Sequence, residues 1–149
     1  LRDAKELALT AHRGQVDKAG EDYFSGHLTR VAIGVVDAAM RDVFTKPEVV
    51  LDALAATAFL HDILEDTKVV EEDLIEVFPL EVVRSVKLLT RGDEETYAEF
   101  IDRLIASEDR MAIRVKWADV KDHLREVKHI PASLERRYLK ALDKLESVI

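Results

Sequence analysis

The 149-residue sequence predicts an all-α fold, and we expect one domain over residues 1–149. Apolar residues recur every three or four positions along most of the chain, which is the period of an amphipathic helix. Only 5 glycines and 3 prolines are present, and no segment shows the alternation that is typical of a β-strand. A chain of this length can bury roughly two-thirds of its unfolded surface, so a hydrophobic core should form without a disulfide.

Three helices are expected in the first half of the chain, over about 2–13, 28–42 and 47–66. The segment 14–27, GQVDKAGEDYFSGH, contains three of the 5 glycines and is predicted to be a loop. Proline is favoured at the first position of a helix, so Pro47 marks the start of the third. This third helix should run through the apolar sequence LDALAATAFL into HDILED.

The second half of the chain shows the same periodicity. A short acidic segment precedes a helix that begins near Pro79. Three longer amphipathic segments follow, and no repeat, low-complexity tract or linker separates them. The expected helices cover about 71–77, 79–89, 95–106, 109–128 and 132–148.

Composition narrows the functional classes. The net charge of −8, from 30 acidic and 22 basic residues, argues against a nucleic-acid partner and against an anionic membrane surface. The chain has no cysteine, so any metal must be held by His, Asp or Glu, and a reducing compartment is favoured. No membrane-length apolar run or signal-peptide pattern is present, so we expect a cytoplasmic protein.

The stretch FLHDILEDT, residues 59–67, places four ionisable groups in a mostly apolar helix. On a continuous helix, His61, Asp62, Glu65 and Asp66 would fall within an arc of about 140°. That polar face either meets solvent or lines a site that needs carboxylates and an imidazole. The segment by itself leaves both interpretations open.

Two further residues extend this pattern. Asp119 lies on the apolar stripe of AIRVKWADVKDHLRE, where a salt bridge to Lys116 or Arg125 could compensate its burial. His27 lies at the start of the second helix, where it could be a packed or capping histidine. Together with His61 and Asp62, these residues form a ligand set suited to one Mn²⁺, Fe²⁺ or Zn²⁺ ion.

Several motifs in order resemble a known family. They are AHRGQ at 11–15, DKAG followed by Tyr23 and GHLTRVA, HDILEDT at 61–67, and VKWADVKDH at 115–123. Over about residues 4–125 the chain resembles the HD-domain hydrolases of the RelA/SpoT homologue family, and in particular its small stand-alone hydrolases. The resemblance implies a single-domain helical bundle of the HD superfamily.

The resemblance also implies a function. In that family one Mn²⁺ would be held by His27, His61, Asp62 and Asp119, while Glu65 and Asp66 would position or deprotonate the attacking water. The implied substrate is a small purine nucleotide, the alarmone (p)ppGpp, which is hydrolysed at its 3′ position to release pyrophosphate. The substrate contacts implied are Lys18, Lys116 and His123.

The chain departs from the family at three positions. Asp17 stands where long family members carry an arginine, Leu28 replaces a proline, and His123 replaces an asparagine. Two alternatives therefore stay open beside the alarmone hydrolase. One is a metal-dependent phosphatase that releases orthophosphate from a nucleotide or NADPH, and the other is a non-catalytic helical metal-binding module.

Overall fold

The computed structural model describes residues 1–42, 47–125 and 127–149, and it confirms the all-α prediction. Among these residues there is no β-strand, and the only ladder contact is an isolated bridge between Val16 and Asp22. No helix in the described ranges is long and apolar enough to span a membrane. The helices are α1 (Arg2–Ala11), η1 (Phe24–Leu28), α2 (Thr29–Met40), α3 (Pro47–Leu60), α4 (Ile63–Asp66), α5 (Glu71–Ile75), α6 (Leu80–Leu88), α7 (Tyr97–Ala106), α8 (Arg110–Arg125), η2 (Val127–His129) and α9 (Ala132–Glu146).

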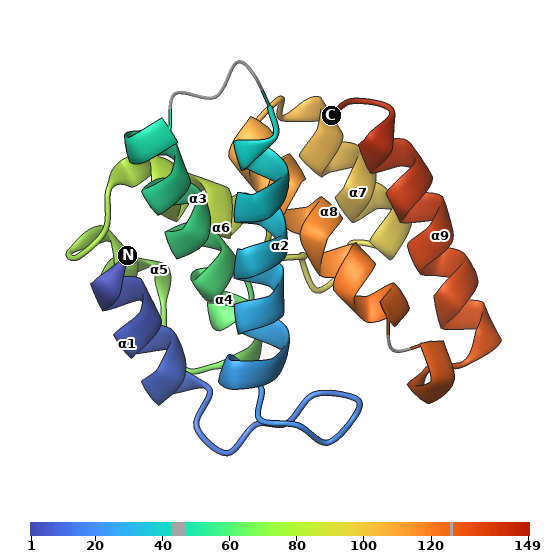
Figure 1. Cartoon of the computed structure of the whole chain (residues 1–149), viewed down its shortest axis with the longest axis horizontal. Helices are drawn as coiled ribbons and strands as arrows, with labels where there is room; N and C mark the ends of the chain where they lie inside the picture. Colours follow the sequence, from blue (N-terminus) through green and yellow to red (C-terminus); the bar gives the residue numbers. More distant parts are fainter. Residues whose placement is uncertain (43–46, 126) are drawn as a thin grey trace.

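Helix α2 is central to the bundle (Figure 1). It packs against α3 on one side and against α8 on the other. Helices α1 and α6 pack against α3, whereas α9 packs against α7 and α8. The chain between α1 and α2 closes one end of this assembly, so residues from the first loop lie near the ends of α3 and α8.

The core consists of two clusters of buried apolar side chains. The larger one joins α2, α3, α7, α8 and α9, and the smaller one joins α3, α4, α5 and α6 with the start of α1. Fully buried members of the larger cluster include Leu54, Phe100 and Leu104. Burial of each such side chain contributes about 1.5–3 kcal/mol, so these clusters fix how the helices cross.

The predicted helix 47–66 is interrupted at His61 and Asp62. Helix α3 ends at Leu60 and α4 begins at Ile63, with Asp62 at φ −100° and ψ 0° between them. The carbonyl of Ala58, which would accept from Asp62 N–H in a continuous helix, instead contacts His61 Nδ1 at 2.6 Å. The prediction of one uninterrupted helix over 47–66 was therefore wrong, and at the break the His61 imidazole contacts a carbonyl that a backbone N–H would otherwise use.

The predicted loop 14–27 ends in the wide helical turn η1. Leu28 N–H donates to the carbonyl of Tyr23, five residues earlier, at 3.0 Å. This i to i+5 geometry is rare in proteins, and where it occurs it is often found at a functional site. A Cβ on Gly26 would lie 3.0 Å from Asp17 Oδ2 and 3.3 Å from an Arg30 guanidinium nitrogen, so glycine permits this close approach. His27 is buried within the turn.

The C-terminal helices match their predicted positions with shorter bounds. Helix α8 ends at Arg125 rather than near residue 128, and the three residues of η2 form a tighter 3₁₀ turn. Residue 126, within the predicted helix, lies outside the described residues. Pro131 is the N-cap of α9 and disfavours helical geometry in the residue before it, which separates η2 from α9.

Candidate metal centre

Three separate parts of the fold bring four of the predicted site residues together. His27 comes from η1, His61 and Asp62 from the turn between α3 and α4, and Asp119 from the middle of α8. One ligand atom of each residue lies within 4.8 Å of every other, which is the spacing of a group that could hold a metal ion. His27 Nε2 lies 3.2 Å from Asp119 Oδ1, and His61 Nε2 lies 3.1 Å from Asp62 Oδ2.

The atoms that face this point lack hydrogen bonds. His27 Nε2, His61 Nε2 and Asp119 Oδ1 are buried and have no hydrogen-bond partner within the described part of the chain. Each of these residues is no more than 2% exposed. Unsatisfied buried polar atoms cost free energy, and native structures rarely leave several of them facing one another. A divalent cation would satisfy all three, and the two nitrogens and two carboxylate oxygens fit such an ion.

The opposite nitrogen of each imidazole is held by an acceptor. His27 Nδ1 lies 2.8 Å from Asp122 Oδ2, and His61 Nδ1 lies 2.6 Å from the carbonyl of Ala58. Because a carbonyl only accepts, His61 Nδ1 must carry the proton, and Asp122 favours the same form of His27. Both Nε2 lone pairs can therefore point into the cluster, as a metal ligand requires.

The electrostatics of the cluster favour a positive charge at its centre. Burial raises the pKa of Asp62 and of Asp119, but His61 and Lys116 outweigh it and hold both values well below the usual range. Burial lowers the pKa of His61, yet the charge of Asp62 beside it raises the value to about 10. The imidazoles thus supply positive charge that a divalent cation would replace, with release of protons.

Lys116 and His123 both contact Asp119. Lys116 Nζ donates to Asp119 Oδ2 at 2.7 Å, which leaves Oδ1 directed at the cluster. This is the salt bridge that the sequence offered as an alternative for Asp119, so Lys116 engages one oxygen of the carboxylate while the other faces the imidazoles of the cluster. His123 Nε2 lies 3.1 Å from Asp119 Oδ1, and its ring stacks on His27 and on Tyr138.

The sequence analysis missed the hydroxyl of Tyr23 as part of this site. Tyr23 entered the sequence analysis only as part of a family motif, but its hydroxyl donates to Asp62 Oδ2 at 2.6 Å. Burial raises the pKa of this hydroxyl far above its usual value and Asp62 raises it further, so it remains protonated. The donated hydrogen bond fixes the orientation of the Asp62 carboxylate.

Asp122 and Arg30 were also missed. Arg30 donates through Nε to Asp122 Oδ1 at 2.7 Å, and Asp122 in turn holds His27. Both residues lie three positions after a candidate ligand on the same helical face, since Arg30 follows His27 and Asp122 follows Asp119. That spacing was the sequence signal that could have identified them.

Asp17 has a structural role in the first loop. Its Oδ1 accepts from the N–H groups of Ala19 and Glu21 at 3.0 and 2.9 Å, and its Oδ2 accepts from Arg30 at 3.0 Å. Asp17 therefore connects the first loop to Arg30, which in turn contacts Asp122 beside His27.

Glu65 and Asp66 lie in α4, just beyond the turn that carries His61 and Asp62, and both are exposed. Partial loss of hydration raises the pKa of Glu65, the N–H of Arg91 lowers it, and the charge of Asp62 raises it. The pKa of Asp66 is raised by the same loss of hydration and by Asp62. Carboxylates with raised pKa values beside a metal-binding cluster are suited to accept a proton.

The predicted substrate contacts lie on one side of the cluster. Lys18 is exposed, and its ammonium group donates to the hydroxyl of Tyr138 at 3.1 Å. The Tyr138 ring is nearly parallel to that of His123, with centroids 4.9 Å apart. Lys18 and His123 thus both contact Tyr138, whereas Lys116 forms a salt bridge with Asp119. Their role in substrate binding stays a prediction.

Comparisons with known proteins find relatives named as kinases and relatives named as hydrolases. Over 92% of its length the chain is 30% identical to a GTP pyrophosphokinase of Myxococcus xanthus, of which it covers 18%. No model of a known protein family matches the chain. Over 92% of its length the chain is 31% identical to a protein of Vibrio cholerae named guanosine-3′,5′-bis(diphosphate) 3′-pyrophosphohydrolase, and it covers 19% of that protein. The corresponding values for the bifunctional (p)ppGpp synthase/hydrolase SpoT of Escherichia coli are 30% identity, 92% and 19%.

A solved structure extends the likeness to the whole chain. It is described as a metazoan ortholog of SpoT that hydrolyses ppGpp, and it superimposes with a TM-score of 0.76 and 25% identity. The alignment covers 99% of this chain and 85% of that one. The chain is thus similar over nearly its whole length, in sequence and in fold, to hydrolases of the RelA/SpoT type. It spans about a fifth of the length of the curated relatives it matches.

Removal of divalent metal should lower the melting temperature of this domain. A cation that binds only the folded cluster stabilises it by about 2.7 kcal/mol at a concentration 100 times its Kd. We expect a chelator to lower the melting temperature measured by circular dichroism, and Mn²⁺ to restore it. The Asp62→Ala variant should show no response to either, and a wild-type melting curve unaffected by verified metal removal would contradict a metal site.

Replacement of Asp122 by alanine should weaken metal binding. Without this acceptor, His27 can rotate or change tautomer, and loss of such partners lowers metal affinity by about 10- to 100-fold. Calorimetric titration of the metal-free variant with Mn²⁺ measures the change in the dissociation constant. Asp37→Ala on the exposed face of α2 is the matched control, and equal affinities for both variants would show that Asp122 does not orient His27.

Proposed function

We propose that this chain is a Mn²⁺-dependent phosphohydrolase whose single domain, residues 1–149, cleaves the 3′ pyrophosphate from (p)ppGpp. The observation that carries the proposal is the cluster of two imidazoles and two carboxylates, in which several buried atoms lack a hydrogen-bond partner. Glu65 and Asp66 follow this cluster in the sequence, on α4. The names of the relatives and of the structural neighbour support the same substrate. The protein would act in the cytoplasm on a small purine nucleotide.

His27, His61, Asp62 and Asp119 are the residues that would hold the ion. Bound there, a divalent cation lowers the pKa of a coordinated water and neutralises charge on a phosphoryl oxygen. The chain's own contribution is orientation: Asp122 and the Ala58 carbonyl fix the two imidazoles, while Tyr23 fixes Asp62. Lys116 keeps the pKa of Asp119 low, so this carboxylate remains ionised and available as a ligand.

Glu65 and Asp66 would act on the attacking water. Both lie on α4, one turn beyond His61 and Asp62, and both have raised pKa values. The backbone N–H of Arg91 already holds one oxygen of Glu65, so the other oxygen is available to orient a water or to accept its proton. General-base assistance of this kind contributes about 10²- to 10⁴-fold to a rate.

Lys18, Lys116 and His123 would contact the nucleotide. The buried ring of Tyr138 lies between Lys18 and His123, so it would hold these two side chains in position to contact a phosphate or the base. His123 can donate a hydrogen bond as the asparagine of the family would, although its ring is larger.

A second candidate activity is the release of orthophosphate from NADPH or another nucleotide. The engagement of Asp17 with the loop and Arg30 favours it, because no arginine is available at that position to stack on a guanine. The product distinguishes the two activities. Pyrophosphate indicates the alarmone hydrolase and orthophosphate indicates the phosphatase.

The first test is a product assay. Purified protein reloaded with Mn²⁺ is incubated with ppGpp, and pyrophosphate and orthophosphate are quantified separately. We expect pyrophosphate and GDP from the wild type and neither from Asp62→Ala, which loses a predicted ligand. Orthophosphate alone would replace the proposal by the phosphatase, and no product from a metal-loaded wild type would favour the non-catalytic metal-binding module.

The Glu65→Gln variant should separate metal binding from turnover. The amide oxygen can still accept from Arg91 N–H, but the side chain can no longer take a proton. We expect kcat to fall by about 10²- to 10⁴-fold while the Mn²⁺ affinity stays at the wild-type value. Glu72→Gln on the exposed first turn of α5 is the matched control, and full turnover by Glu65→Gln would remove Glu65 from the mechanism.

A further inference from the structure

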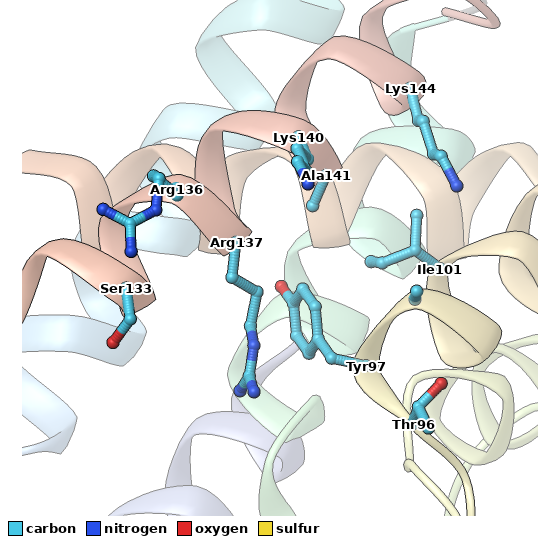
Figure 2. Close-up of a pocket in the computed structure, with 10 residues that line it drawn as sticks. Thr96, Tyr97, Ile101, Ser133, Arg136, Arg137, Lys140, Ala141 and Lys144 are labelled. Atoms are coloured by element: carbon cyan, nitrogen blue, oxygen red, sulfur yellow. The ribbon is translucent and has the colours of Figure 1, made fainter.

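A second concave site lies between α7 and α9. Its volume is about 420 Å³, and Figure 2 shows its wall on α9 facing residues at the start of α7. Basic side chains of α9 line it together with the N-cap and the first residue of α7, namely Arg136, Arg137, Lys140, Lys144, Thr96 and Tyr97. No carboxylate is among its lining residues. A site lined in this way favours an anion, although the whole chain carries a net charge of −8.

Most of these cations are not neutralised by the protein. Lys144 pairs with Asp102 at 2.7 Å. By contrast, no ion pair to a carboxylate is found for Arg136, Arg137 or Lys140 within residues 1–42, 47–125 and 127–149. Arginine presents a planar fork of donors that matches phosphate oxygens, and lysine adds a mobile point charge.

Tyr97 contributes a polar group to the lining of the pocket. Its hydroxyl is buried and has no hydrogen-bond partner in the described part of the chain. Arg137 lies over its ring, with the guanidinium carbon 5.3 Å from the centroid, and Figure 2 shows these two side chains next to each other. Burial raises the pKa of this hydroxyl to about 12, so at neutral pH it is a donor without an acceptor. A bound anion would supply the acceptor.

The pocket adjoins the metal centre. Lys116 Nζ lies 5.5 Å from the centre of the Tyr97 ring and 2.7 Å from Asp119 Oδ2, so one ammonium group separates the pocket wall from a predicted metal ligand. Tyr97 also packs edge-on against Tyr138, whose ring stacks on His123. The pocket and the cluster are therefore neighbours, separated by the side chains of Lys116, Tyr97 and Tyr138.

We propose that the α7–α9 pocket binds the 5′ phosphates of the nucleotide whose 3′ pyrophosphate lies at the metal centre. This inference rests on the proposed function and deepens it, because it makes the number of 5′ phosphates a determinant of substrate preference. Arg137 and Lys140 hold the distal phosphates, and the hydroxyl of Tyr97 donates to one of their oxygens. None of these groups takes part in bond cleavage, so their contribution is to binding.

The test is a series of three substrates with the same 3′ pyrophosphate and one, two or three 5′ phosphates: pGpp, ppGpp and pppGpp. In the wild type we expect kcat/KM to rise about tenfold from the monophosphate to the triphosphate, as one charge-assisted hydrogen bond would give. The change should lie in KM with kcat preserved, which is the signature of binding energy that the ground state and the transition state share.

The double variant Arg137→Ala/Lys140→Ala should flatten this series, with KM for pppGpp approaching that for pGpp and kcat unchanged. The matched control is Arg84→Ala/Lys87→Ala, which removes the same two charges from the outer face of α6 and should keep the wild-type series. Melting curves for both variants verify folding. The single variant Tyr97→Phe, which deletes only the hydroxyl, should show part of the effect.

The outcomes separate the two proposals. Wild-type turnover with equal kcat/KM for all three substrates, or an unchanged series in the double variant, would overturn the phosphate pocket while leaving the hydrolase function in place. A flattened series in the α6 control would show that general charge, rather than this pocket, attracts the substrate, and it would also overturn the pocket. Absence of pyrophosphate release by the wild type from every member would overturn the proposed function and this inference with it.

Discussion

The placement of two ionised carboxylates at one point, with Asp119 buried and Asp62 partly exposed, is the constraint on which the rest of the structure depends. Asp62 and Asp119 face the same small volume, and removing their charges from water costs several kcal/mol unless positive charge is supplied. Two imidazoles and Lys116 surround them, and they hold both pKa values well below the usual range. The helices that carry these residues must therefore meet closely, and the apolar clusters on either side keep them there.

The backbone departs from regular helix at the two places where the site requires it. At the end of α3 the imidazole of His61 donates to the carbonyl of Ala58. The helix ends there, and Asp62 lies in the turn that faces the cluster. At η1 the wide turn places His27 inside the bundle, and Gly26 leaves room for Asp17 and Arg30 behind it. Both irregularities bring candidate ligands into the cluster, where second contacts fix the orientation of these side chains.

The distribution of charge suits an anionic small molecule. A net charge of −8 repels anions at long range, so a phosphorylated substrate must be recognised by local groups. Lys18 meets Tyr138 on one side of the cluster, and the basic side chains of α9 line a pocket on the other side of Lys116. The acidic exterior and these basic sites together favour a compact, highly charged ligand over an extended polyanion.

The sequence by itself determined the all-α class, the order of the helices and the four candidate ligands. Helical periodicity and the rarity of glycine and proline are local properties, and the motifs around His27, His61 and Asp119 can be recognised without knowledge of packing. Only the tertiary structure decided that α3 breaks before Asp62, that Tyr23 and Asp122 orient ligands, and that α9 opposes Tyr97 across a pocket. These features arise between segments far apart in the chain, where one side chain competes for the hydrogen bond of another, and no local pattern records that competition.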